Sequence, residues 1–275
     1  MNKGLNLLFC FITIISSCAI GQQETGKIKS NRFFELAPAL DYINLSNPRH
    51  SIVRYSGLAY SFNFGLQFEK PTKREGIYLN YLKGGLTSQN GLNTTGVFNI
   101  ALGYFLERRI KQLSETTNWY LGGDFSTFLN MRQNFSLGNN QMFYDFVQDL
   151  RISTSIRKEL EWKNRPLYVD YRLKLPLIAL ISRPPKAVFV KDSEKEDVMP
   201  TSDQLTKNMF TNGNISLAGK YSTIQSTIVL WCPFKKNMNR IGLSYIWDLY
   251  AYRDYYNKKQ VMATHSIKFI LLTNL

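Results

Sequence analysis

The sequence predicts an all-β fold, a transmembrane antiparallel up-and-down β-barrel of about ten strands, and three observations support this prediction. From residue 33 onward, apolar and polar side chains alternate over successive segments, as they do in strands with one face in an apolar medium. The gaps between these segments are alternately shorter and longer, which places the turns at one end of the sheet and the loops at the other. The chain also begins with an export signal.

Residues 1–21 have the features of a signal peptide. A positive charge at Lys3 precedes a mainly apolar stretch that is too short to cross a bilayer as a helix. A small-x-small site ends at Gly21 and predicts cleavage before Gln22. The alternative is a lipobox that ends at Cys18, and processing there would leave a lipid on this cysteine.

The rest of the chain is predicted to form one domain. Residues 22–32 form a polar periplasmic tail without periodicity, and residues 33–275 form the barrel. The gap over residues 181–214 is much longer than the others and is predicted to be an extracellular loop. This loop is a candidate contact for a protein partner, and a hairpin within it would raise the number of strands from ten to twelve.

The predicted strands differ in how clearly they alternate. The second shows the pattern best, because large apolar residues from Leu58 to Phe68 are separated by small or polar ones. The first contains Pro38, which lacks an amide proton and therefore predicts an edge or a bulge. The eighth changes phase between Tyr221 and Ile224, which also predicts a bulge. The strands are expected at residues 33–44, 58–69, 77–87, 96–107, 118–132, 142–157, 167–180, 215–231, 241–252 and 261–272.

Charged side chains are predicted to fill the interior of the barrel. Ten strands lie near the size at which side chains occupy the whole interior, whereas about 16 to 18 strands leave an aqueous channel. Both signs of charge occur on neighbouring strands, and unpaired charges in a narrow lumen would be costly, so we expect ion pairs across it. A selective pore lined by these charges is the alternative. The predicted lumen charge network consists of Asp124, Asp145, Asp149, Arg151, Asp170, Arg172, Lys174 and Asp248.

Three tryptophans are predicted to anchor the barrel at one membrane interface. Trp119, Trp162 and Trp231 all fall where a strand meets a short turn. Amphipathic indoles favour membrane interfaces. An even number of strands also puts both termini at the turn end, which is the periplasmic end in bacterial barrels.

The formal net charge of +14 and the pI of about 9.6 raise the question of a nucleic-acid partner. The export signal argues against nucleic acid, because an exported chain does not meet it in the cytoplasm. Lys and Arg are in excess around the predicted turns. Membrane lipids, and anionic lipids in particular, are therefore the expected partner class.

No catalytic or metal site is predicted. Both histidines are followed directly by serine, as His50-Ser51 and His265-Ser266, whereas the phospholipase and lipid A deacylase barrels carry His-x-Ser. Adjacent strand residues point to opposite faces, so neither pair can act as nucleophile and base. The Asp-x-His of the omptin proteases does not occur, and no His or Cys cluster has metal-ligand spacing. We expect a non-enzyme without cofactor.

The export signal before Gln22 and the alternation over residues 33–275 resemble exported outer-membrane barrels of the Bacteroidota. The resemblance is architectural, so it carries no functional residues onto this chain. It implies location in the outer membrane of a Gram-negative bacterium, with periplasmic termini. The leading hypothesis is a non-enzymatic structural or accessory subunit of a larger outer-membrane complex. A narrow solute-selective channel and an outer-membrane lipid-modifying enzyme are the alternatives.

Overall fold

The computed structural model consists of β-strands and their connections. It describes residues 31–46, 53–134, 141–163, 165–182, 214–217, 220–234, 239–253 and 259–275. The predicted signal peptide, Cys18, the tail up to residue 30 and residues 183–213 of the long loop lie outside these ranges. Within the described ranges, no helix is long and apolar enough to cross a membrane.

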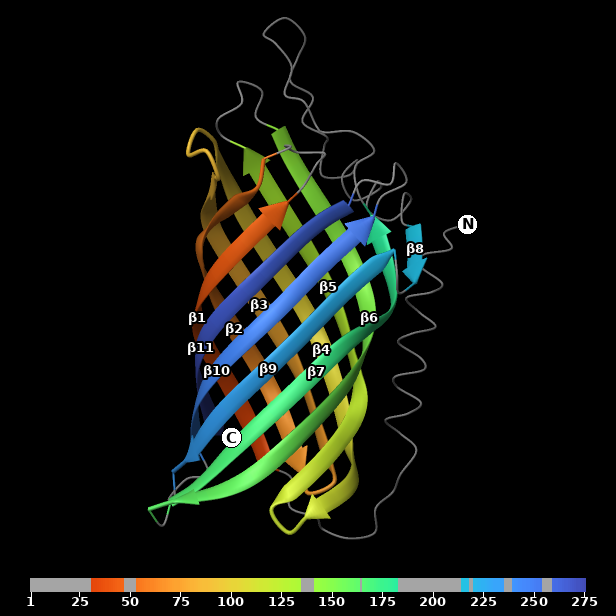
Figure 1. Ribbon diagram of the computed structural model, residues 1–275. Coiled ribbons are helices and arrows are strands. Elements are labelled where there is room, and N and C mark those ends of the chain that lie inside the picture. Colours follow the sequence, from red (N-terminus) through yellow and green to blue (C-terminus); the bar gives the residue numbers. More distant parts are fainter. Residues whose placement is uncertain are drawn as a thin grey trace, which may run out of the picture.

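Ten strands close into an antiparallel barrel, which confirms the predicted fold class. Each wall strand pairs with its neighbour in sequence, β7 pairs with β9, and β1 pairs with β11 to close the ring. Figure 1 shows the strongly tilted wall, in which the hairpins β2–β3, β4–β5 and β6–β7 turn at the same end. The strands are β1 Asn31–Ser46, β2 Tyr55–Lys70, β3 Lys73–Ser88, β4 Thr94–Ser114, β5 Thr117–Asn134, β6 Gln141–Trp162, β7 Arg165–Ser182, β8 Asn214–Leu217, β9 Tyr221–Pro233, β10 Arg240–Arg253 and β11 Lys259–Asn274.

The predicted eighth strand, residues 215–231, is divided in the structure into the short strand β8 and the wall strand β9. β8 pairs with the end of β7, where Leu217 lies opposite Ile178. β9 then pairs with β10 from Tyr221 to Pro233 without a register shift, so the predicted bulge between Tyr221 and Ile224 is wrong. Tyr221 lies in the lumen, where its hydroxyl donates to Asp149 Oδ2 at 2.7 Å.

The strands at the turn end are longer than the apolar alternation predicted. Only residues 71–72, 115–116 and 163–164 separate β2 from β3, β4 from β5, and β6 from β7. The hairpins β4–β5 and β6–β7 therefore extend past the rest of the wall (Figure 1). As a result, Arg74 and Glu107 lie within strands, with both side chains in the lumen.

The two faces of the wall differ as expected for a membrane barrel. Outward side chains are large, apolar and exposed, and they occur on every wall strand. Inward side chains in the middle of the lumen are buried and polar or charged. Representative outward residues are Phe34, Leu40, Phe62, Leu79, Leu102, Leu121, Ile152, Tyr171, Ile228, Leu243 and Phe269.

Pro38 fits into the wall without a bulge. β1 and β2 stay in register through Pro38 and Phe62, while the pairing of β1 with β11 omits residues 37–38. The missing amide proton is therefore accommodated on the β11 side, and β1 is not an edge strand. The prediction of an edge or a bulge at Pro38 is therefore wrong. A register shift does occur in the β6–β7 ladder, between Leu150 and Arg151 opposite Pro176.

We predict that Gly122→Ala destabilises the barrel. A Cβ at Gly122 would lie 1.9 Å from the carbonyl oxygen of Leu106 and 2.7 Å from Cα of Glu107, so β4 and β5 would have to separate. Such overpacking typically costs about 1–3 kcal/mol. The measurement is urea unfolding in detergent micelles, followed by the heat-modifiable gel mobility of folded barrels. Gly85→Ala is the control, because nothing lies within 4 Å of a Cβ there. Equal stability of the two variants would contradict the prediction.

Candidate functional site in the lumen

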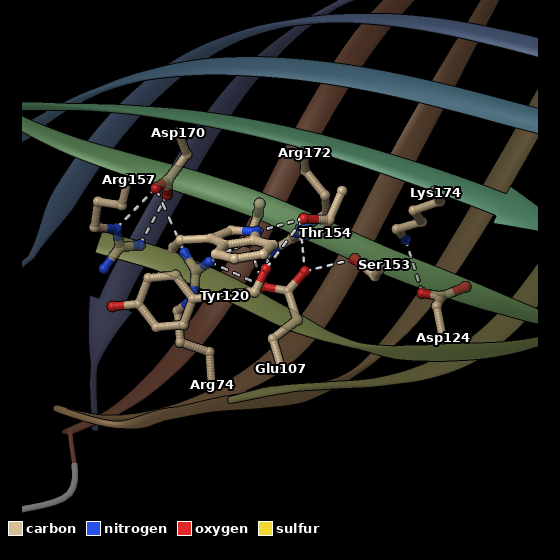
Figure 2. A network of polar contacts seen from close by, with 12 residues as sticks. Arg74, Glu107, Tyr120, Asp124, Ser153, Thr154, Arg157, Asp170, Arg172 and Lys174 are labelled. Carbon is tan, nitrogen blue, oxygen red and sulfur yellow. Dashed lines mark hydrogen bonds and ion pairs between the residues drawn. The ribbon is translucent and has the colours of Figure 1, made fainter. Parts of the chain in front are cut away.

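Glu107 on β4 is the centre of a buried polar network in the lumen, and its side chain is 0% exposed. Its carboxylate accepts from Arg74 Nη2 at 2.9 Å and lies 2.9 Å from Arg172 Nε (Figure 2). The hydroxyls of Ser153 and Ser155 donate to it at 2.6 Å and 3.0 Å. One carboxylate thus links four strands, β3, β4, β6 and β7.

Asp170 on β7 forms a second centre towards the turn end. Arg157 Nε and Nη2 each donate to it at 2.8 Å, in the two-pronged geometry that guanidinium and carboxylate favour. Arg74 Nη1 lies 3.4 Å away, and Trp231 Nε1 donates at 3.0 Å from β9. Arg157 also contacts Glu69 at 3.1 Å, which extends the network to β2.

Asp124 on β5 forms a third centre. It pairs with Arg151, its register partner on β6, and accepts from Lys174 Nζ of β7 at 2.7 Å (Figure 2). Tyr78 on β3 donates its hydroxyl to Asp124 at 3.2 Å and accepts from Arg151 Nη2 at 3.2 Å. These contacts cross the lumen between strands that are not neighbours in the wall.

Three further carboxylates of the predicted network lie towards the loop end. Asp149 lies 3.7 Å from Arg151 Nε and accepts from the hydroxyl of Tyr221. Asp145 pairs with Arg132. Asp248 accepts a hydrogen bond from Gln225 at 3.5 Å and forms no ion pair within 4.0 Å in the described part of the chain.

The structure therefore places every predicted network residue except Asp248 in an ion pair. Sequence reasoning omitted Arg74 and Glu107, which join the centres together. Arg74 was assigned to a turn and Glu107 to the end of a strand, because apolar alternation stops there. The inward series Arg74, Gly76 and Tyr78 has a period of two, and following it past the apolar stretch would have identified Arg74.

Two apolar clusters lie in the lumen towards the loop end. One cluster includes Ile43, Tyr55 and Val97, and a second includes Val147, Tyr221 and Tyr250. Met262 packs against both clusters, so apolar side chains reach across the barrel at this level. A third cluster lies at the turn end and comprises Phe33, Ala37, Val229, Trp231, Ile270 and Leu272, with Tyr168 packed against it.

The prediction of Trp231 as an interface anchor is wrong. Its side chain is 6% exposed and lies in the lumen, because its indole N–H has a buried acceptor in Asp170. Trp119 has the opposite orientation and lies on the outer face, where it donates to Thr154 Oγ1 at 2.8 Å. Trp162 is 61% exposed at the tip of the β6–β7 hairpin.

A cavity of about 280 Å³ lies between the apolar clusters and the ion-pair network. The wall opposite the network, on β1, β2, β10 and β11, contributes several polar and charged side chains to the lining. Asp41 Oδ2, Ser61 Oγ and Ser244 Oγ are buried there without a protein hydrogen-bond partner. Lys268 also lines the cavity, and it has no ion pair within 4.0 Å among the described residues. Water or a small polar solute can satisfy such groups.

His265 does not face the lumen. It lies on the outer face of β11, and its Nδ1 is hydrogen-bonded to the hydroxyl of Tyr245 at 2.7 Å. The predicted pair His50-Ser51 lies outside the described residues. Among the described residues, no group of three His, Cys, Asp or Glu side chains could hold a metal ion.

No protein-family model matches the chain, and no curated protein matches its sequence. The outer membrane protease OmpT from Escherichia coli has a similar structure, with a TM-score of 0.52 and 7% identity over 92% of this chain and 100% of that chain. The translocator domain of the autotransporter NalP from Neisseria meningitidis has a TM-score of 0.39 and 8% identity, over 98% and 96% of the two chains. The OmpT similarity shows that this chain has the fold of bacterial outer-membrane β-barrels.

We predict that Asp170→Asn lowers the free energy of unfolding by about 3–5 kcal/mol, because it leaves Arg157 and Arg74 buried without their shared carboxylate. Urea unfolding of the refolded barrel measures this loss. Glu75→Gln is the control, since Glu75 forms a partly exposed pair with Lys73 at 2.8 Å and should change stability by about 1 kcal/mol or less. The network would have no energetic role if both variants unfolded at the same urea concentration.

Proposed function

We propose that this protein is a non-enzymatic barrel of the bacterial outer membrane that serves as a structural or accessory subunit of a larger membrane complex. Its turn end and both termini face the periplasm, as short turns do in barrels of this kind. One observation carries the proposal: ion pairs cross the lumen between strands that are not neighbours in the wall, and two apolar clusters meet at Met262 towards the loop end.

The filled lumen favours a rigid scaffold over a transport path. Glu107, Asp170 and Asp124 each connect three or more strands, so the wall cannot widen without breaking buried ion pairs. At the loop end, ions would have to pass an apolar layer at Met262, and such constrictions exclude water. We therefore place the contacts with other molecules on the outer surface and the loops.

The outer face of β1, β10 and β11 is the surface on which we place the partner. His265 lies there in one row with Tyr42 and Trp247, next to Tyr245. Polar and ionisable groups on a lipid-facing wall are costly, and they usually mark a functional contact. His265 and Tyr245 share one hydrogen bond, and their remaining donor and acceptor groups can bond to a neighbouring membrane protein.

Site-specific photo-cross-linking tests this placement. Tyr42 is 44% exposed, and replacing it with p-benzoylphenylalanine puts the reactive group beside His265. We expect a discrete protein adduct of fixed mass after irradiation of whole cells. The same replacement at Ile152, which is 38% exposed on the opposite wall strand β6, is the control and should give no such adduct. Absence of an adduct at position 42, or the same adduct at both positions, would contradict the proposal.

A narrow solute-selective channel is the second candidate. It is favoured by the polar and charged side chains of the cavity wall, which include Ser61, Ser244 and Lys268. A channel of this kind would need a path past Met262.

Osmotic swelling of proteoliposomes in small polar solutes separates the two candidates. The scaffold predicts no swelling by the native protein and faster swelling after Met262→Ala, which thins the apolar layer. Leu230→Ala, on the outer face, is the matched control and should leave the rate unchanged. Swelling by the native protein that Lys268→Ala abolishes would favour the channel instead.

A further inference from the structure

The outer face of the wall at the turn end carries cations that have no partner in the described protein. Arg108 and Lys111 on β4 and Lys158 on β6 are exposed, and none forms an ion pair within 4.0 Å with another described residue. Glu75, an acid on this face, is already paired with Lys73 at 2.8 Å and accepts from the hydroxyl of Tyr104 at 3.1 Å.

A bulge brings Lys111 to this face. The register of β4 and β5 shifts between Arg109 and Lys111, so that Arg109 faces Tyr120 and Lys111 faces Trp119. Tyr120 is buried in the lumen, and its ring lies 3.8 Å from the guanidinium of Arg74. Without the extra residue, Lys111 would point to the inner face like Arg109. β-Bulges commonly serve to redirect a side chain in this way.

Trp119 lies beside the two cations and is held in place. Its Nε1 donates to Thr154 Oγ1 at 2.8 Å, and the Thr154 hydroxyl donates to the carbonyl oxygen of Tyr120 at 3.3 Å. Arg108 lies opposite Leu121 in the ladder, and Lys111 lies opposite Trp119. Arg108, Lys111 and the indole of Trp119 therefore lie between the turn end and the apolar part of the outer face.

We propose that this face binds an anionic phospholipid of the leaflet at the turn end. Arg108 and Lys111 contact the phosphate headgroup, Trp119 lies at the level of the ester groups, and the acyl chains pack against Leu121 and Ile156 above it. Cations near an anionic membrane surface and amphipathic indoles at the interface both favour this arrangement. The inference rests on the membrane placement in the proposed function, but it requires no protein partner.

Native mass spectrometry of the full barrel tests this site. The protein is released from mixed micelles that contain equal amounts of phosphatidylglycerol and phosphatidylcholine with the same acyl chains. We expect the native protein to retain phosphatidylglycerol selectively. Arg108→Gln combined with Lys111→Gln should weaken this retention about 30-fold, because each cation contributes about a factor of five.

Lys83→Gln is the matched control, since Lys83 is an exposed lysine on β3 towards the loop end. It should retain phosphatidylglycerol like the native protein. Unchanged retention in the double variant, or equal retention of both lipids by the native protein, would overturn the site. If the double variant does not fold in gel-mobility assays, a salt titration of the native protein tests the site instead. Its retention of phosphatidylglycerol must fall as the salt concentration is raised. Retention that salt does not alter would also overturn the site, whether or not the cross-linking experiment finds a partner.

Discussion

Charges inside a narrow barrel must be paired, and the rest of this structure depends on that constraint. Removing an ion from water costs several kcal/mol after relaxation, and only close opposite charges and hydrogen bonds offset this cost. Glu107, Asp170 and Asp124 each meet two cations, and Arg74 joins the first two centres. Because the partners come from β3 to β7, the pairs form only when these strands have one particular register. The ion pairs in the lumen and the strand register of the wall therefore require each other.

The polar network also explains the distribution of apolar and small residues. Glycine at position 122 lets β4 and β5 approach beside Glu107, and serines at 153 and 155 supply the hydroxyls that this carboxylate accepts. Beyond the network, the lumen changes character, because Met262 packs there against two apolar clusters towards the loop end. The contacts that we propose therefore lie on the outer surface, where His265 on one wall and Arg108 and Lys111 on another break the apolar pattern.

The sequence predicted the wall well and the rims poorly, and one physical reason explains both results. In the middle of the barrel, outward side chains are apolar and inward side chains are polar, so alternation located all ten wall strands, although several strand ends differ from the prediction by five to seven residues. At the rims this relation reverses. Trp231 and Tyr221 point inward into apolar clusters, while Arg108 and Lys111 point outward towards the expected headgroups. Alternation also says nothing about contacts across the lumen, so the meeting of Arg74 on β3 with Asp170 on β7 followed only from the three-dimensional structure.

Single-channel recording on the purified native barrel in planar lipid bilayers tests the central claim most directly. The claim is that paired charges and an apolar layer close the lumen. The account predicts that the inserted protein shows no steady current over the voltages at which bilayers are stable. Insertion would be verified on the same membranes by the protease resistance of the barrel. A steady open current of fixed unit size from the native protein would contradict the account.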